Sequence, residues 1–318
     1  MKKILVLASA LLFVLGCSKE ESTKLDEKSA VHFAAQRGCG SMHVLDEQLK
    51  SDPSLGSRMR EIETFTQEAI ASNRLVNGVI EIPVVVNVLY RTAAENISLA
   101  QIQSQIDVLN QDFNGQNPDF NLVPADFSGV KANVGIRFVL EQVIRKSTTK
   151  TSWGTRDDMK NARKGGIAAT SPATNLNMWV CTIGGGILGY AQFPGGSLST
   201  DGVVIDSRYF GNTGTATAPF NKGRTATHEV GHWMNLRHIW GDATCGNDFV
   251  ADTPVHNGPN YGCPSQPHFS TCSGTPREMT MNYMDYSDDA CMYMFSNGQK
   301  SRMLAIFAAG GPRNSFAQ

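Results

Sequence analysis

The sequence shows no marked excess of charge of either sign and no run of lysine and arginine. Its 318 residues include 28 Lys and Arg against 29 Asp and Glu, which gives a formal net charge of −1. Nucleic-acid binding through phosphates needs a strongly basic surface, so this balance argues against a nucleic-acid partner. The chain also has no internal repeat and no low-complexity tract. With 41% hydrophobic and 18% charged residues, it has the composition of an ordinary globular protein with room for one sizeable domain and extensions.

The apolar run at the N-terminus is too short to span a bilayer, but it has the length of a signal-peptide core. It covers Ile4–Gly16 and follows two lysines, so we expect residues 1–16 to be a signal peptide. The four residues ending at Cys17 resemble a bacterial lipobox, after which Cys17 would be acylated. Lys19–Glu21 resembles the charged sequence that sends Bacteroidetes lipoproteins to the outer surface. We therefore expect an exported protein, either held at the outer membrane or cell surface by a lipid or released by processing. A plain secretory signal with a chance cysteine is the alternative.

One segment has the spacing of an open catalytic zinc site, and it begins His228-Glu229-Val230-Gly231-His232. Positions i and i+4 share one helix face, so His228 and His232 would point the same way. Glu229 could reach a water at the metal without occupying the metal itself. His238 lies too far along the chain for the same helix face. The helix must therefore end between the histidines, and Asn235 is the only candidate for the turn. On its own the short motif also occurs on solvated helix faces.

Support for the zinc site comes from the downstream segment Met281–Tyr286. With it, the chain resembles the metzincin metalloproteases, most closely the pappalysin family (peptidase family M43, the cytophagalysin-like bacterial branch). The superfamily motif is H-E-x-x-H-x-x-G-x-x-H followed by a Met-turn. Met284 matches the Met-turn methionine, a hydrophobic floor under the histidines. Tyr286 matches a tyrosine near the metal whose hydroxyl could stabilise an oxyanion. Core packing is the alternative for both residues.

Asn235 departs from the family motif, which has glycine at this position. Glycine is favoured there because the helix end needs a residue at positive φ. Asparagine is the usual second choice for that conformation, so we expect the turn to form and to deliver His238.

The resemblance implies a fold and an activity. The fold would be an α/β (α+β) metzincin fold, with a mixed twisted sheet, a backing helix and an active-site helix in an upper subdomain, and an irregular disulfide-stapled lower subdomain. The protein would be a secreted or surface-anchored zinc endopeptidase that hydrolyses peptide bonds in proteins through a zinc-activated water. The zinc ligands would be His228, His232 and His238, with Glu229 as general base. The alternative is a catalytically inactive surface lipoprotein that uses the scaffold to bind proteins, but such a protein would be expected to lose the base or a ligand.

Four cysteines cluster after the zinc motif, and an exported protein keeps disulfides. Their spacing alone permits three pairings. The resemblance implies Cys245–Cys272 and Cys263–Cys291, which would staple the loop after the third histidine. A second zinc site is the competing interpretation, but the C-x₂-C pairs that it would need are absent.

The segment Gly246–Pro254 offers several oxygen atoms of the kind that calcium prefers. Pappalysin relatives bind structural calcium around this segment. The resemblance therefore suggests Asp248, Asp252 and Thr253 as calcium ligands. Turn-forming Asp and Thr side chains that bond to the local backbone are the alternative.

The region before the catalytic domain is polar and helix-prone, and we expect residues 17–77 to be a lipid-anchored prosegment. Asp46–Lys50 and Arg58–Ala71 are its predicted helices, and it contains little that could form a core. Cys39 lies within it. A thiolate over the zinc would keep the enzyme latent, because zinc binds sulfur well. His43 or Asp46 could block the site instead, or Cys39 could pair with Cys181.

We expect the catalytic domain to occupy residues 78–318, with strands alternating with a helix before the zinc motif. β-branched and apolar runs predict the strands, and apolar residues at helical spacing predict the helix Leu99–Phe113. The predicted strands are Val79–Tyr90, Val134–Ile144, Asn175–Ile183 and Gly202–Asp206.

The stretch Gly184–Gly189 satisfies G-x-G-x-x-G, but no helix opens after it, so nucleotide binding is rejected. In metzincins a strand here pairs with the substrate backbone, which makes Gly189–Phe193 the predicted cleft edge. Asp285–Phe295 usually shapes the S1′ pocket in the superfamily, and its Met, aromatic and Asp residues would suit either an apolar or a basic side chain.

Overall fold

The computed structural model describes Met1 and residues 36–76 and 78–317. Apart from Met1, the predicted signal peptide, residues 1–16, lies outside the described residues, as does the predicted lipidation site Cys17. Within the described ranges, no helix is both long enough and apolar enough to cross a membrane.

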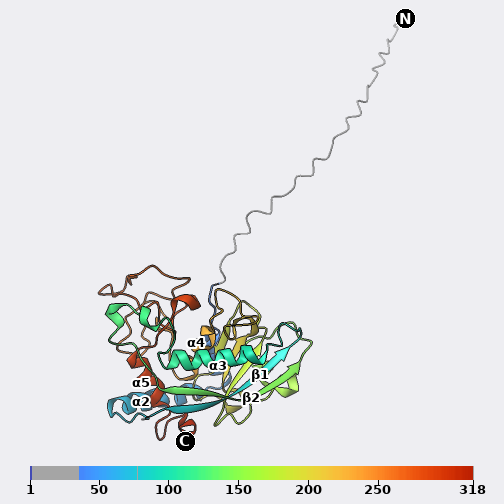
Figure 1. The fold of residues 1–318 in the computed structure, drawn as a ribbon, viewed down its shortest axis with the longest axis horizontal. Helices are drawn as coiled ribbons and strands as arrows, with labels where there is room; N and C mark the ends of the chain where they lie inside the picture. The colour runs from blue at the N-terminus through green and yellow to red at the C-terminus, as the bar shows by residue number, and fades with distance from the viewer. Residues whose placement is uncertain (2–35, 77, 318) are drawn as a thin grey trace. The chain divides into compact units, whose positions relative to one another are not determined.

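A five-stranded sheet forms the centre of the catalytic part, in the order β2-β1-β3-β5-β4 (Figure 1). The strands are β1 (Ile80–Tyr90), β2 (Ile136–Ser147), β3 (Leu176–Cys181), β4 (Gly189–Ala191) and β5 (Val203–Asp206). The first three and β5 run parallel, whereas β4 pairs antiparallel with β5 at one edge. All residues of β3 and β5 are buried, as expected for parallel strands covered on both faces. The metzincin-type mixed sheet is therefore confirmed.

Two helices of the catalytic part pack on this sheet and carry the predicted periodicity. Helix α3 (Leu99–Phe113) begins at Ser98, whose side chain accepts a hydrogen bond from the backbone N–H of Gln101. Its apolar residues at helical spacing are buried against β2. Helix α4 (Arg224–Trp233) carries the zinc motif, is buried at every residue, and contacts α3, β4 and β5. The sheet and the backing helix thus fix the active-site helix from two sides.

The chain after α4 is irregular until helix α5 (Asn297–Ala305), which begins with a capping box between Ser296 and Gln299. Two disulfides cross-link this irregular part, Cys245–Cys272 and Cys263–Cys291, the pairing that the resemblance implies.

Short 3₁₀ turns occupy many connections throughout the chain: η1 (Phe120–Leu122), η2 (Ala125–Phe127), η3 (Asp158–Lys160), η4 (Ala162–Lys164), η5 (Leu198–Thr200), η6 (Ser207–Tyr209), η7 (Asp289–Cys291) and η8 (Asn314–Phe316).

The predicted prosegment forms two helices, α1 (Ser41–Ser51) and α2 (Leu55–Ala71), both longer at the N-terminal end than the sequence predicts. It contains few core residues, as expected, but these few pack against the catalytic part. Val44 packs in one cluster with residues of β3, β4 and β5, and Leu45 and Leu55 pack on Phe193. The sequence pattern hides this because the buried positions are few and lie among charged residues. Residues 72–79 connect α2 to β1.

The strand bounds differ from the predicted ones by one to three residues. β1, β3 and β5 each begin one residue later than predicted, and β3 ends at Cys181, two residues before its predicted end. β2 starts at Ile136 and runs on to Ser147, because it pairs with β1 along the whole length of β1. The edge strand β4 ends at Ala191, two residues before its predicted end at Phe193.

Candidate active site

Three histidine side chains converge at the C-terminal half of α4 and the turn after it. The Nε2 atom of His232 lies 3.2 Å from that of His228 and 3.1 Å from that of His238. The Nδ1 atoms face oxygen atoms instead. His228 Nδ1 lies 2.7 Å from the Tyr283 carbonyl oxygen, and His232 Nδ1 lies 2.8 Å from the Leu236 carbonyl oxygen. The third, His238, faces the Asp242 carboxylate at 2.5 Å.

These contacts fix the tautomers, because each Nδ1 donates its proton to an oxygen and leaves a lone pair on Nε2. The three lone pairs therefore meet at one point. Tetrahedral zinc with Zn–N bonds of about 2.0–2.1 Å places its nitrogen ligands roughly 3.3 Å apart, close to the observed separations. Burial lowers the pKa of His228 and of His232 well below the usual value, which keeps both neutral and able to bind metal. The donor set fits zinc.

Asn235 makes the turn that brings in the third histidine. Its φ is 71°, the left-handed conformation expected from the sequence. The backbone N–H of Leu236 donates to the Gly231 carbonyl and that of Asn235 to the His232 carbonyl, which ends the helix in a tight turn. The asparagine thus adopts the conformation for which the family uses glycine.

Met284 lies directly under α4 and is fully buried. A Cβ atom at Gly231 would lie 2.5 Å from the Met284 sulfur, so the glycine is what allows this close approach. The Met284 carbonyl also accepts a hydrogen bond from Ile239, next to His238. The methionine therefore contacts both the helix and the turn that carry the histidines, as expected for a Met-turn.

Tyr286 stands beside the histidines, with its ring centroid 5.0 Å from that of His238 and 4.7 Å from that of Trp240. Its hydroxyl donates to the carbonyl of Cys39 at 3.5 Å. The tyrosine hydroxyl therefore faces the site in which the prosegment lies.

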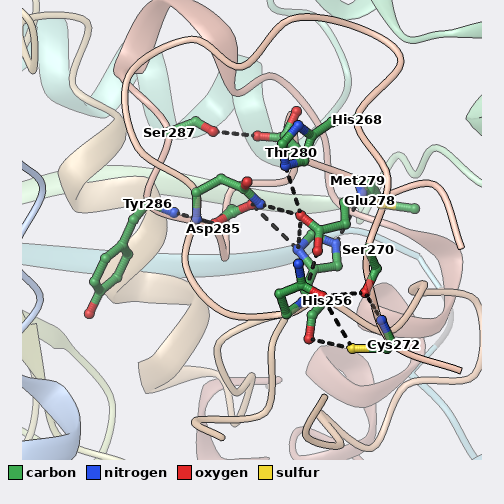
Figure 2. Close-up of polar contacts among 12 residues, drawn as sticks. His256, His268, Ser270, Cys272, Glu278, Met279, Thr280, Asp285, Tyr286 and Ser287 are labelled. Atoms are coloured by element: carbon green, nitrogen blue, oxygen red, sulfur yellow. Dashed lines mark hydrogen bonds and ion pairs between the residues drawn. The ribbon is translucent and has the colours of Figure 1, made fainter. Parts of the chain in front are cut away.

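A buried polar network holds the loop that carries Tyr286 (Figure 2). One oxygen of Asp285 accepts from the backbone N–H of Tyr286 (2.7 Å) and of Asn260 (2.8 Å), and its other oxygen accepts from the Asn260 amide at 2.9 Å. The same amide donates to Glu278 at 2.8 Å. His256 is fully buried beside both carboxylates. Sequence reasoning missed this network because Asn260, Glu278 and His256 stand in no recognisable motif.

Glu229 lies fully buried, next to the first histidine along the chain. Its carboxylate accepts from the Ser41 hydroxyl at 2.8 Å and from the Cys39 thiol at 3.4 Å. Burial raises the pKa of Glu229 to about 7, although the hydrogen bonds from Ser41 and Cys39 oppose this shift. A carboxyl group of this kind can take up and release a proton near neutral pH.

The segment around Cys39, in the predicted prosegment, lies against the histidines and β4. The Cys39 sulfur and the Nε2 atoms of the three histidines lie within 4.8 Å of one another. The Gly40 N–H donates to the Gly189 carbonyl (2.9 Å), and the Leu188 N–H donates to the Gly38 carbonyl (2.8 Å). The segment around Cys39 therefore pairs parallel with the start of the edge strand β4. Among the described residues Cys39 forms no disulfide, and neither does Cys181.

The other two candidate blockers point away from the site. His43 and Asp46 are exposed on α1, and Asp46 pairs with Lys50. Of the three residues considered from the sequence, only Cys39 lies at the histidines.

Arg37 is buried next to the histidines, and we call the space that it fills between Asp289, Ser287 and Phe220 the Asp289 pocket. Its guanidinium pairs with Asp289 at 2.5 Å, donates to the Ser287 carbonyl at 3.1 Å, and lies over the Phe220 ring at 4.9 Å. The side chains of Arg37 and Asp289 are 1% and 0% exposed, so the pocket encloses the charge pair. Lys222 donates its backbone N–H to the second oxygen of Asp289. The sequence placed Asp289 in the S1′ segment but could not show that this aspartate reaches the bottom of a pocket.

The candidate calcium ligands separate into two places. Asp248 accepts from the Thr253 hydroxyl (2.8 Å to one oxygen) and from the backbone of Val250. Asp252 instead accepts from Ser296 and from the backbone of Gly298 at the start of α5. Only Asp248 and Thr253 of the three come together.

Comparisons with known proteins agree with this geometry. The peptidase M43 family model, described as pregnancy-associated plasma protein-A, matches residues 178–308. An extracellular metalloprotease of Pyricularia oryzae is 31% identical over 88% of this chain and 92% of its own length. Extracellular metalloprotease 1 of Coccidioides posadasii is 37% identical over 66% of this chain and 70% of its own.

Two solved structures from Tannerella forsythia are similar as well. Mature mirolysin in complex with a cleaved peptide is 44% identical, with a TM-score of 0.74, over 76% of this chain and 97% of that one. A mutant of promirolysin is 41% identical, with a TM-score of 0.80, over 88% and 97% respectively.

Proposed function

This chain belongs to peptidase family M43, the pappalysin metalloproteases, and is a zinc metalloendopeptidase; we propose that it is exported and that His228, His232 and His238 hold its zinc. The single observation that carries the ligand assignment is the convergence of three Nε2 lone pairs, each fixed by an oxygen at Nδ1. When bound, zinc would acidify a water and polarise the substrate carbonyl.

The chain's own residues would supply the proton transfers and part of the charge stabilisation. Glu229 takes the proton of the attacking water and later delivers it to the leaving amine nitrogen. Tyr286 donates its hydroxyl proton in a hydrogen bond to the oxyanion that forms in between. No serine or cysteine nucleophile is required.

We propose that Cys39 keeps the unprocessed chain latent. Its sulfur lies within 4.8 Å of all three Nε2 atoms, where it would take the position that the reacting water needs. The prosegment backbone also pairs with the free edge of β4, the edge on which a substrate backbone would pair. Activity would therefore require release of this segment.

The processed enzyme would prefer substrates with a basic residue in the pocket that Arg37 now fills. Asp289 at the base of this pocket is fully buried, and the Ser287 carbonyl adds a second acceptor for a guanidinium. A buried carboxylate is stabilised by a bound cation and destabilised by an apolar group. Of the two preferences that the sequence left open, this geometry favours the basic one.

Cleavage of a peptide library by the processed protein tests the proposed function. We expect cuts on the N-terminal side of Arg and Lys, since the pocket would hold the residue after the scissile bond. Glu229→Gln should abolish hydrolysis while zinc content, measured by atomic absorption, stays at one per chain. Asp289→Asn should lower kcat/KM for basic substrates by about tenfold or more, because a charge-assisted hydrogen bond is lost. Hydrolysis by Glu229→Gln, or cleavage without regard to basic residues, would contradict the proposal.

The location and the calcium site complete the proposal. Relatives named extracellular metalloproteases support export, and anchoring through an acylated Cys17 is the form of export that we propose. A structural calcium at Asp248 and Thr253 is proposed on the family resemblance alone, because the Thr253 hydroxyl and the Val250 N–H donate to Asp248 as in a local turn. A purely protein-binding role is less favoured, since every residue that catalysis needs is present.

A further inference from the structure

We propose that Arg302 forms a binding site for an acidic side chain of the substrate, and that Glu63 of the prosegment occupies this site before processing. The inference rests on the proposed function, in which the prosegment leaves the cleft.

Arg302 lies on α5, and its side chain is 1% exposed. Its two terminal nitrogens donate to the two oxygens of Glu63 at 2.9 and 2.8 Å, the bidentate arrangement of a strong guanidinium–carboxylate pair. Glu63 belongs to α2, which contacts α5 and lies beside it in Figure 1. Within the described residues, Glu63 is the only carboxylate that pairs with Arg302.

Among the described residues of the catalytic part, no carboxylate forms a salt bridge with this guanidinium, although its charge opposes the burial that raises the pKa of the nearby Asp248. Its remaining partners are two carbonyl oxygens, of Phe249 and Asn235, at 3.4 and 3.3 Å. A buried charge that loses its partner is strongly destabilised. Once α2 has left, Arg302 would therefore favour any carboxylate that can reach it.

The site adjoins the catalytic centre, because Asn235 makes the turn that delivers His238. A cavity of about 380 Å³ lies between the prosegment helices and the catalytic domain at this point, and Pro194, Asn235 and Phe249 line its far side. Arg237 also lines it and lies over the Phe193 ring at 5.0 Å. Burial tends to raise the pKa of Glu63, but Arg302 and, more weakly, Arg237 lower it, so the site favours an ionised carboxylate.

The prosegment thus carries two charged residues into two pockets of opposite sign. Arg37, before Cys39, enters the Asp289 pocket, and Glu63, after Cys39, enters the Arg302 pocket. The processed enzyme would then select substrates that carry a basic residue for the first pocket and an acidic residue for the second. The prosegment's aspartates and other glutamates make no such buried pair in the described residues.

A paired peptide scan with the processed enzyme tests this inference. The parent peptide carries one Arg at the cleavage site, and Glu or Gln is placed at each other position in turn. We expect kcat/KM to be at least about tenfold higher for Glu than for Gln at one position, since a hydrogen bond between charged groups is worth about 1.5–3 kcal/mol. In Arg302→Gln this ratio should fall to about one. Lys300→Gln, on the same helix, should keep the wild-type ratio.

The ratio is taken within each variant, so a partly unfolded Arg302→Gln preparation does not change it. The same peptide pairs are also measured for binding to the processed Glu229→Gln protein by fluorescence anisotropy. Here the expected preference for Glu does not depend on hydrolysis, so failure of the proposed catalytic mechanism remains distinguishable. The inference is overturned if no position prefers Glu, or if Arg302→Gln keeps the preference.

Discussion

At the scale of single residues, the proposed zinc site depends on Asn235 for its third ligand. It holds a φ of 71°, a conformation in which a Cβ atom is costly, and asparagine tolerates this better than most residues. The turn that it makes brings His238 to within 3.1 Å of His232. A conformational preference of one residue is thereby coupled to metal binding.

Substitutions at Asn235 in the processed enzyme should follow the cost of positive φ. Asn235→Gly should bind zinc as well as the wild type does. Asn235→Val should lose about 1–3 kcal/mol of stability and bind zinc more weakly, because a β-branched residue is strained there. Chemical unfolding and zinc titration measure both effects. Equal zinc affinity in the Val and Gly variants would show that the turn does not depend on this residue's backbone preference.

Cys39 is the residue on which latency should depend most. Cys39→Ala removes the sulfur at the histidines, so the unprocessed chain should gain activity and be converted to the processed form faster. The time course of peptide hydrolysis by full-length protein measures this, with Cys181→Ala as the control for loss of a buried thiol that lies outside the site. Unchanged latency in Cys39→Ala would contradict the switch.

At the scale of structural elements, the loop from Met284 to Tyr286 depends on contacts from a distant loop. Asp285 accepts hydrogen bonds from the backbone N–H and from the side-chain amide of Asn260. The Glu278 carboxylate, which lies near Asp285 in Figure 2, accepts a second hydrogen bond from the same side-chain amide. The segment between the disulfides is therefore tied to the loop that presents Tyr286.

Asp285→Asn should displace Tyr286, because either orientation of the new amide turns its NH₂ group toward a hydrogen-bond donor. We expect kcat to fall by about tenfold with KM and zinc content nearly unchanged. Tyr286→Phe should show a similar loss, and the double variant should lose little more, since coupled residues are not additive. Additive losses would mean that Asp285 acts independently of Tyr286.

Elements differ in how far the sequence predicts them. Local patterns predict α3, β1 and the histidine pair on α4, because helix and strand periodicity and the i, i+4 spacing need no knowledge of the rest of the chain. Met284 and the disulfides come from the family resemblance. The pair of Arg37 with Asp289 joins residues 252 positions apart, and no local pattern could reveal such a contact. The Asp242 contact to His238 was missed because it depends on the path of the turn.

At the scale of the whole molecule, the prosegment and the catalytic domain share one hydrophobic interior. Val44 packs with Trp179 and Tyr190 of the sheet, so the predicted boundary between residues 77 and 78 separates parts of the chain that are packed together. The irregular lower part has little regular structure of its own and relies on cross-links, two disulfides and the proposed calcium.

Calcium removal should lower the stability of the whole molecule. Chelation of calcium with zinc kept saturated should reduce Tm by about 5 °C, as expected for a ligand present at about 100 times its Kd. Asp248→Asn should abolish this shift. Asp252→Asn should lower Tm through the loss of its contacts to α5 but should keep the shift. An unchanged Tm after chelation of calcium would contradict the proposed calcium site.

Cleavage of the connector at residues 72–79 would make the proposed latency depend on protein concentration. While it is intact, the segment from Arg37 to Ala71 is tethered beside the cleft, and its effective concentration there is on the order of millimolar. A cut in the connector breaks none of the contacts with Asp289, Arg302 or the histidines, yet it turns their formation into a bimolecular reaction. The cleaved complex would then stay inhibited in a crowded compartment and become active on dilution.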